Sequence, residues 1–277
     1  MVKQMENKKI TASTKVDRKF LDLLKTFDLF QETPHKNEVI LEIKNLTKKF
    51  YVFPRKYVNA LNGINLKIYK EDKIALLGAN GAGKTTLLEI ICGVNKQSNG
   101  TINYNYDYLE TPYEKIGIQF QDASCPAGLT VYDLINIQNY VISKPLTDNE
   151  IVKFVEYFTL DKILTQKANR LSGGQQQILN IALAFMSNPN IILLDELSTA
   201  LDVDKQFYVN KIVRDYINYN KSTLILSSHN IKEILFHTNR TIIIKKGKIV
   251  ADVPNSAIIE HFKDFDFFLS NFLKYDA

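Results

Sequence analysis

The sequence is short of the residues that build disulfide frameworks and metal clusters. It contains no tryptophan and only two cysteines, Cys92 and Cys125, among its 277 residues. Two cysteines placed in this way match neither a disulfide framework nor the spacing of a cysteine-ligated metal site. They are typical of a protein that works in a reducing compartment. The four histidines are scattered along the chain, so they predict no metal site either.

Long hydrophobic runs are also missing. No stretch approaches the roughly 18 apolar residues that a membrane-spanning helix needs. The longest runs, such as Ile191–Leu194 and Ile242–Ile244, have the length of strands. The first residues lack the apolar segment of a secretory signal. If the protein works at a membrane, we expect another polypeptide to anchor it there.

Charge of one sign is not concentrated anywhere in the chain. The net charge is +5 and the pI is about 8.9, but lysine and glutamate alternate through most of the sequence. A nucleic-acid-binding protein more often shows a basic stripe, so this function is disfavoured. Hydrophobic residues make up 45% and charged residues 23%, as in an ordinary globular protein.

Both ends of the chain are predicted to be short extensions. In residues 1–37, a polar start is followed by Thr14–Asp17, which is typical of a capping box, and by Pro34 as a helix stop. Apolar residues recur between them at helical spacing, namely Val16, Phe20, Leu23, Leu24, Phe27 and Phe30. We expect this amphipathic helix to pack on its own domain or on a partner chain, with a membrane-surface helix as the alternative. Residues 253–277 are rich in phenylalanine and predict a helical tail formed by one packed C-terminal helix, with a regulatory contact as the alternative.

The middle of the chain has the pattern of an α/β fold. Residues 39–46 and 64–68 alternate like strands of a half-buried antiparallel sheet, while 74–77, 191–194 and 223–226 are apolar runs suited to strands buried on both faces. Helical segments separate these runs, which indicates a mainly parallel sheet. Residues 129–140 and 149–158 predict helices of an inserted helical subdomain at about 122–170. No internal repeat is present.

The strongest local motif is the segment Gly78–Thr85, which follows a predicted strand and precedes a predicted helix over 85–92. Its pattern, G-x-x-x-x-G-K-[ST], is that of a phosphate-binding loop, in which backbone N–H groups surround the phosphates of a nucleotide. Lys84 is expected on the β- and γ-phosphates and Thr85 on Mg²⁺. A chance glycine-rich turn is the other interpretation. The predicted ATP-binding residues here are Gly78, Asn80, Gly81, Ala82, Gly83, Lys84, Thr85 and Thr86.

An acidic pair, Asp195 and Glu196, comes directly after the apolar run 191–194. In open α/β sheets, ligands bind at the carboxyl ends of the strands. Asp195 can therefore reach Mg²⁺ directly or through water. Glu196 can accept the proton of an attacking water or hold that water in line with the γ-phosphate. A solvated acidic pair at a strand end is the alternative.

The segment Leu171, Ser172, Gly173, Gly174 and Gln175 resembles the signature motif of ABC ATPases, and it precedes a helix predicted over about 175–186. A serine and two glycines at a helix start form an anion site, although a simple helix cap is possible. The resemblance covers about residues 39–252, within an ATPase domain predicted over 38–252. It implies an α/β P-loop NTPase core with a mainly parallel sheet, an antiparallel β subdomain and the helical subdomain. It also implies that this motif completes the ATP site of an opposite subunit.

Three further residues are assigned by the resemblance. Gln121 is similar to the Q-loop glutamine that contacts Mg²⁺ and the water, with Gln119 as the competing candidate. Asp202 lies in a segment, residues 199–202, that resembles the D-loop of the dimer interface. His229 resembles the switch histidine that contacts the γ-phosphate, although a purely structural histidine is possible.

The adenine base is expected to stack on an aromatic residue upstream of the phosphate loop. Phe50 best matches the register of the family, and Tyr51 or Tyr57 could serve instead. The sequence also departs from the family pattern. Leu197 stands where many relatives have proline, and Ile178 and Leu183 stand where basic residues are frequent. None of these changes removes a catalytic group.

The resemblance implies an ATPase with ATP and Mg²⁺ as ligands. Two copies, identical or not, would dimerise head to tail around two ATP molecules and drive a separate transmembrane permease from the cytoplasmic face of a membrane. The alternative is a soluble ABC ATPase that acts with cytosolic partners, for example in cofactor assembly. The substrate and the direction of transport are not encoded in these motifs.

Overall fold

The computed structural model describes residues 15–31, 37–54, 56–120, 125–197, 201 and 203–274. Its centre is a six-stranded sheet in the order β5-β6-β7-β3-β8-β9. The strands are β3 (Lys73–Leu77), β5 (Ile116–Gln119), β6 (Ile191–Asp195), β7 (Thr223–Ser227), β8 (Arg240–Lys245) and β9 (Lys248–Pro254). Strands β5, β6, β7, β3 and β8 are parallel, and β9 is antiparallel to β8. The apolar runs are buried along almost their whole length because helices cover both faces of a parallel sheet.

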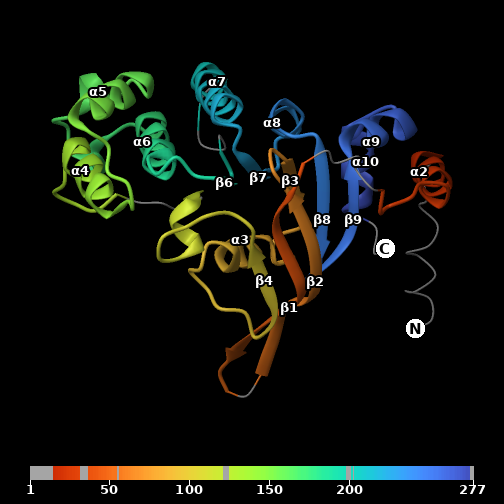
Figure 1. Ribbon diagram of the computed structural model, residues 1–277. Coiled ribbons are helices and arrows are strands. Elements are labelled where there is room, and N and C mark those ends of the chain that lie inside the picture. The colour runs from red at the N-terminus through yellow and green to blue at the C-terminus, as the bar shows by residue number, and fades with distance from the viewer. Residues whose placement is uncertain are drawn as a thin grey trace.

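A second sheet is antiparallel, in the order β2-β1-β4. Its strands are β1 (Val39–Val52), β2 (Lys56–Tyr69) and β4 (Asn99–Tyr104). The first two are longer than the sequence predicts, because they continue as a hairpin that projects beyond the body of the molecule (Figure 1). Tyr51 and Tyr57 are paired with each other near the end of this hairpin.

Arg240 ties the two sheets together. Its guanidinium donates to Oδ2 of Asp72 at 2.7 Å, to Oδ2 of Asp252 at 2.7 Å and to the carbonyl of Lys67 at 3.1 Å. Lys67 belongs to β2, whereas Asp252 belongs to β9. The charge is buried but paired on both sides, and removing one partner of such a group typically costs about 3–5 kcal/mol.

The helices lie around the central sheet, with α7 and α8 on one side of it and α3 between it and the antiparallel sheet (Figure 1). Helix α3 (Lys84–Ile91) follows the phosphate loop, and α7 (Val203–Asn220) and α8 (Ile231–His237) connect the strands of the central sheet. Helices α4 (Val131–Val141), α5 (Asp148–Tyr157) and α6 (Gly173–Phe185) lie together at one end. Short 3-10 turns span Pro112–Lys115, Asp161–Ile163 and Ala168–Arg170. Helix α6 begins two residues before its predicted start, since Ser172 is already its N-cap.

Capping boxes fix where the helices of the inserted region begin. Thr130, Thr147 and Ser172 each accept a hydrogen bond from the backbone N–H three residues later. The side chain at that third position bonds back to the N–H of the cap, so two backbone donors are satisfied together. These helices share one hydrophobic cluster with α7, in which Phe185 packs against Tyr216 with ring centroids 4.5 Å apart.

The first and the last described helices lie together at the opposite side of the molecule. Helix α2 (Lys15–Lys25) packs against α9 (Asn255–Phe262) and α10 (Phe265–Phe272) (Figure 1). Phe20 is fully buried, with its ring 5.7 Å from that of Phe262 and 5.9 Å from that of Phe267. The predicted N-terminal helix therefore packs on its own chain. The predicted capping box at Thr14 lies outside the described residues.

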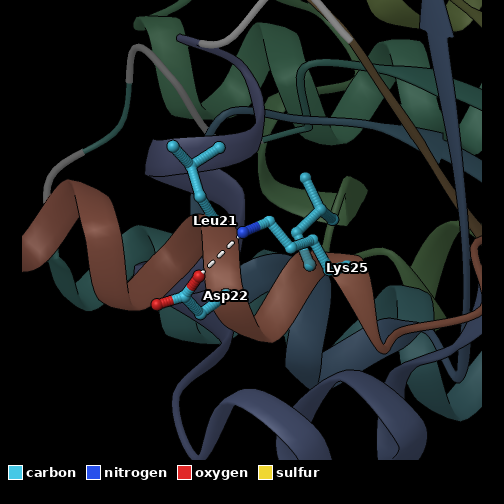
Figure 2. A pocket seen from close by; sticks show the side chains of 4 residues that line it. Leu21, Asp22 and Lys25 are labelled. Carbon is cyan, nitrogen blue, oxygen red and sulfur yellow. Dashed lines mark hydrogen bonds and ion pairs between the residues drawn. The ribbon is translucent and has the colours of Figure 1, made fainter.

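Two details of these ends differ from the predictions. The N-terminal helix ends at Lys25, and Phe30 instead forms a parallel bridge with Asp252 at the edge of the central sheet. The C-terminal tail is two helices, because Lys263 adopts a left-handed conformation and Asp264 caps the next helix. The outer face of α2 carries Leu21 and an exposed ion pair between Asp22 and Lys25 at 3.0 Å (Figure 2). No described helix is long and apolar enough to cross a bilayer.

Candidate nucleotide-binding site

The loop between β3 and α3 is shaped by close approaches of neighbouring backbone. A Cβ atom on Gly78 would lie 2.3 Å from the carbonyl oxygen of Ile244, and one on Gly83 would lie 2.5 Å from that of Ala60. Gly83 also has a φ of 110°, which L-residues rarely adopt. Glycine is thus required at both ends of the loop. Helix α3 begins directly after it at Lys84, one residue before the predicted start.

Lys84 folds back over this loop. Its Nζ donates to the carbonyl of Gly78 at 2.8 Å and lies 3.4 Å from that of Ala79. Burial lowers the pKa of the Lys84 ammonium, and the carboxylates of Asp195 and Glu196 act in the opposite direction. An anion bound in the loop would stabilise the charged form of this half-buried ammonium and raise its pKa.

The acidic pair lies at the carboxyl end of β6, beside the start of α3. Asp195 is buried, and its Oδ2 accepts a hydrogen bond from Oγ1 of Thr85 at 3.0 Å. Glu196 has a φ of 58°, and its N–H donates to the carbonyl of Ser227 at 2.8 Å. Positive φ is uncommon for a non-glycine residue and is enriched at functional sites. The chain therefore holds Glu196 in a turned conformation directly after the strand.

His229 approaches the acidic pair from the neighbouring strand end. Its Nε2 lies 3.8 Å from Oε1 of Glu196, and its side chain is 54% exposed against 15% for Glu196. The loop, both acidic residues and the histidine thus meet at the carboxyl edge of the parallel sheet. That is the edge at which α/β folds bind ligands.

These groups border a cleft of about 410 Å³. The predicted residues that line it are Phe50, Asn80, Gly81, Gly83, Lys84, Thr85, Thr86, Asp195, Glu196 and His229. Four further lining residues, Val58, Asn59, Ala60 and Ser227, were not anticipated. Ser227 directly follows the run 223–226 that is predicted as a strand, so its position after a strand end was the available signal. The other three depend on the register of the hairpin. Gly78 and Ala82, the other two predicted residues of the loop, are not among those that line the cleft.

Phe50 stands at the cleft, whereas the two competing tyrosines do not line it. Phe50 is paired directly with Val58 across the hairpin, and Tyr51 is paired with Tyr57. Because successive residues of a strand point to opposite faces, the tyrosines project to the face away from Phe50. They pack on each other there, with ring centroids 5.4 Å apart. Nζ of Lys48 lies 4.8 Å from the centroid of the Phe50 ring.

The signature segment lies outside this cleft. Ser172 caps α6, where its backbone N–H donates to Oε1 of Gln175 at 3.0 Å. Gly173 has open space around it, whereas a Cβ on Gly174 would lie 2.6 Å from Cδ of Lys205. None of residues 171–175 is among those lining the nucleotide cleft. A single chain therefore does not bring the two predicted anion sites together.

Two predicted residues, Gln121 and Asp202, lie outside the described residues. The competing glutamine, Gln119, is buried at the end of β5, and its Nε2 donates to the carbonyl of Phe120 at 2.8 Å. Gln119 borders a different cavity of about 330 Å³, formed with Gln138 of α4 and Leu183 of α6. Gln119 is not among the described residues that line the nucleotide cleft.

The departures from the family pattern are packing residues. Leu197 is fully buried in the cluster of the helical region, and its carbonyl accepts from Nε2 of Gln177 at 2.7 Å. Ile178 and Leu183 pack against the same cluster. These positions contribute to the core between α6 and its neighbours instead of carrying charge.

Comparison with known proteins decides the family. The sequence model described as ABC transporter matches residues 61–199, which include the phosphate loop, the signature segment and the acidic pair. The chain belongs to the ABC transporter family. The resemblance stated from the motifs is confirmed, and so is the predicted fold class.

Two individual relatives support the assignment of this chain to the ABC transporter family. The energy-coupling factor transporter ATP-binding protein EcfA of Malacoplasma penetrans is 32% identical over 256 residues, which cover 87% of this chain and 86% of EcfA. The aliphatic sulfonates import ATP-binding protein SsuB of Bacillus cereus is 30% identical over 210 residues, covering 75% of this chain and 83% of SsuB. This ABC transporter subunit binds ATP and hydrolyses it to drive transport.

Solved structures show the same architecture. A dimeric ATP-binding cassette in a post-hydrolysis state, bound to ADP and Pi, matches with a TM-score of 0.68 and 26% identity, covering 77% of this chain and 98% of that chain. A nucleotide-free cassette from an ABC transporter matches with a TM-score of 0.67 at 22% identity, covering 83% and 97%. The second likeness concerns the fold alone.

Proposed function

We propose that the chain is a motor subunit in which each ATP is held between the phosphate loop of one copy and the signature helix of a second copy, arranged head to tail. The observation that carries this proposal is the separation of the two anion sites within one chain. Residues 171–175 present a helix start with open space at Gly173, yet they lie outside the cleft that contains Lys84. A helix N-terminus attracts phosphate, and here the phosphate must come from another molecule.

ATP fits the cleft from base to phosphates. The base stacks on Phe50, and the N–H groups at Gly81 and Gly83 face the phosphates. Lys84 leaves the carbonyl of Gly78 and turns to the β- and γ-phosphates. Its pKa then rises towards the ordinary value, because the negative phosphates stabilise the charged form of the ammonium that burial disfavours.

The donor set beside the loop fits Mg²⁺. Oγ1 of Thr85 and Oδ2 of Asp195 lie 3.0 Å apart, and both are oxygen ligands of the kind that Mg²⁺ prefers. Among the described residues no group of three or more histidine, cysteine or acidic side chains forms a site by itself. This agrees with an ion that is held by few protein ligands plus phosphate and water. When bound, Mg²⁺ neutralises charge that develops on the phosphates.

The hydrolytic roles follow from the same geometry. Glu196 accepts the proton of the attacking water, and His229, 3.8 Å from it, contacts the γ-phosphate. Gln121 and Asp202 lie outside the described residues, and the resemblance to the family assigns Gln121 to the metal and the water and Asp202 to the interface between copies. Ser172 of the second copy contacts the γ-phosphate from the other side, so water other than the nucleophile is excluded on closure.

The closing and opening of the two copies around ATP drive a separate transmembrane permease. The cavity formed by β5, α4 and α6 supports this, because it joins the strand before Gln121 to the helix that begins at the signature segment. A permease docked there would therefore contact one element that leads to each half of the nucleotide site. This assignment places the subunit at the cytoplasmic face of a membrane, and co-purification with a polytopic membrane protein tests it.

Mixing two inactive variants tests the shared site. Glu196→Gln disables the phosphate-loop half, and Ser172→Arg disables the signature half. A heterodimer of the two variants keeps one intact site, formed by the loop of the Ser172→Arg copy and the signature of the Glu196→Gln copy. We expect ATPase activity to return on mixing. Lys84→Ala mixed with Glu196→Gln is the control, since both changes lie in the same half and no intact site forms.

Two outcomes would contradict the proposal. One is full ATPase activity of Ser172→Arg alone, since the signature would then have no role in turnover. The other is an absence of recovered activity when folded variants are mixed. A second readout is ATP-dependent dimerisation by light scattering, which we expect for Glu196→Gln and which Ser172→Arg in the same chain should abolish.

A further inference from the structure

A second polar cavity lies at the other end of β3 from the phosphate loop. It has a volume of about 270 Å³ and is bordered by Lys73, by the second half of α7 and by the end of α8. We name it the α7–α8 cavity. Lys73 is the first residue of β3 and Leu77 is the last, so about 13 Å of strand separates this cavity from the phosphate loop. The two sites share no lining residue.

Two cations face this cavity without a carboxylate partner in the described part of the chain. Lys73 donates to Oδ1 of Asn218, a neutral amide. Arg214 stacks on the ring of Phe236, with its guanidinium carbon 4.4 Å from the ring centroid. Stacking fixes the plane of the guanidinium and leaves its edge available for hydrogen bonds. Both groups are thus held in position by contacts that do not neutralise their charge.

The basic groups of the cavity repel one another. Burial lowers the pKa of Lys73, Arg214 lowers it further, and Glu71 acts in the opposite direction as the smallest of the three effects. Burial, together with the charges of Arg214 and Lys73, lowers the pKa of His237 to about 3. His237 is therefore neutral at physiological pH, and its Nε2 lies 2.6 Å from Oδ1 of Asn210.

The ends of two helices reduce the positive potential but do not cancel it. Helices α7 and α8 both end near the cavity, and a helix C-terminus is equivalent to about half a negative charge. Two full cations outweigh two such ends by about one charge. The cavity also carries donors beside the cations, since Asn218 and Asn239 line it. Such a combination of a lysine, a planar guanidinium and amides matches an oxyanion.

We propose that the α7–α8 cavity is a binding site for a phosphate-type oxyanion, with Lys73 and Arg214 as its charged ligands. A phosphate monoester carries close to two negative charges near neutral pH, which suits two cations better than a carboxylate does. The cavity exceeds the size of a phosphate group. The partly exposed Phe236 and Leu235 border the remaining space, so the ligand is either free phosphate or a small phosphorylated molecule.

Thermal unfolding of the full chain measures this binding. Sodium phosphate and phenyl phosphate are titrated separately against sodium chloride of equal ionic strength. We expect both phosphates to raise the midpoint of unfolding above the chloride series. Lys73→Met and Arg214→Gln should each weaken the apparent affinity at least about tenfold, and Arg214→Lys, which keeps the charge but loses the stacked guanidinium, should weaken it less. Tighter binding of phenyl phosphate would identify a phosphorylated organic ligand, and equal binding would identify free phosphate.

Two matched variants separate this site from other sources of binding. Lys211→Gln removes an exposed cation one turn earlier on α7 and should leave the phosphate effect unchanged. Lys84→Ala removes the cation of the phosphate loop, which is itself expected to bind phosphate, so Lys73→Met and Arg214→Gln are also each combined with Lys84→Ala. The phosphate effect that remains in Lys84→Ala should be lost when either change is added. A phosphate effect that disappears in Lys84→Ala alone, that persists when Lys73→Met or Arg214→Gln is added to Lys84→Ala, or that is absent from the wild type would overturn the proposal. If Lys73→Met fails to fold, Arg214→Gln on the exposed face of α7 decides the outcome alone.

Discussion

Oγ1 of Thr85 donates a hydrogen bond to Oδ2 of Asp195 at 3.0 Å, although the two residues are 110 positions apart in the sequence. The bond joins the first turn of α3 to the end of β6. It therefore fixes the distance between the phosphate loop and the acidic pair before any nucleotide binds. If Mg²⁺ binds here as proposed, these two oxygen atoms would serve as its protein ligands.

Asp195→Asn keeps the shape of this contact and removes its charge. We expect ATPase activity to fall by about 100-fold or more, because an amide is a poor ligand for Mg²⁺. Nucleotide binding with EDTA present should change little, whereas the gain in affinity on adding Mg²⁺ should shrink. Fluorescent-nucleotide titrations with and without the metal measure both quantities. Thr85→Ser retains the hydroxyl and serves as the control. An unchanged Mg²⁺ dependence in Asp195→Asn would remove Asp195 from the metal site.

Gly247 supports the phosphate loop from the turn between β8 and β9. Its N–H donates to the carbonyl of Ala82 at 2.9 Å, and a Cβ there would lie 2.6 Å from the carbonyl oxygen of Ala60. Gly247→Ala should destabilise the protein by about 1–3 kcal/mol and raise the KM for ATP, because the turn must move away from the loop.

Gly63→Ala is the matched control for that substitution. Gly63 has a φ of 77°, close to the 75° of Gly247, but a Cβ at Gly63 meets nothing within 4 Å. Both variants carry the strain of positive φ, and only one carries the collision. Urea unfolding and steady-state ATPase kinetics compare them. Equal KM values in the two variants would show that the Gly247 contact has no influence on the loop.

Local motifs predicted the parts of the site that are contiguous in sequence. The loop up to Lys84, the acidic pair after β6 and the cap at Ser172 each depend on residues within a few positions of one another. For this reason their residue types alone indicate strand ends and helix starts. The apolar runs likewise indicated the buried strands, because a strand covered on both faces needs little else to specify it.

The remaining parts depend on contacts between distant segments. Phe30 continues the helical spacing of α2, yet it pairs with Asp252 because the edge of the sheet offers unpaired backbone groups there. Asn59 and Ala60 reach the cleft through the register of a long hairpin, which no local pattern specifies. The division of the C-terminal tail did have a local signal, since Asp264 accepts from the N–H groups of Asp266 and Phe267 as an N-cap.

The buried histidine His237 predicts a pH dependence of stability. Its pKa in the folded chain is about 3, below the ordinary value of 6.5, so the unfolded chain binds more protons between these values. The contribution is fully present above about pH 6.5 and decreases as the pH falls towards 3. Between about pH 7.5 and about pH 5, we expect this residue to lower the free energy of unfolding by about 2 kcal/mol.

His237→Gln isolates that effect from the titration of carboxylates. Glutamine does not titrate, and its amide can donate to Oδ1 of Asn210 as the imidazole does. The variant should be less stable at neutral pH but should lose less stability on acidification. Urea unfolding of both proteins at several pH values gives the difference. Parallel curves for the wild type and the variant would mean that His237 is not held neutral.

Phe20 joins the two ends of the chain, and its removal should loosen them without disturbing the nucleotide site. Phe20→Ala deletes a fully buried ring that lies against Phe262 and Phe267, a change that typically costs about 3–5 kcal/mol. Because α2 packs mainly on α9 and α10, hydrogen exchange measured by mass spectrometry should accelerate in these three helices and not in β3 or β6. Leu21→Ala, on the outer face of the same helix (Figure 2), should change exchange by much less. Faster exchange spread evenly over the central sheet would contradict a local role for this contact, and an unchanged KM for ATP would agree with it.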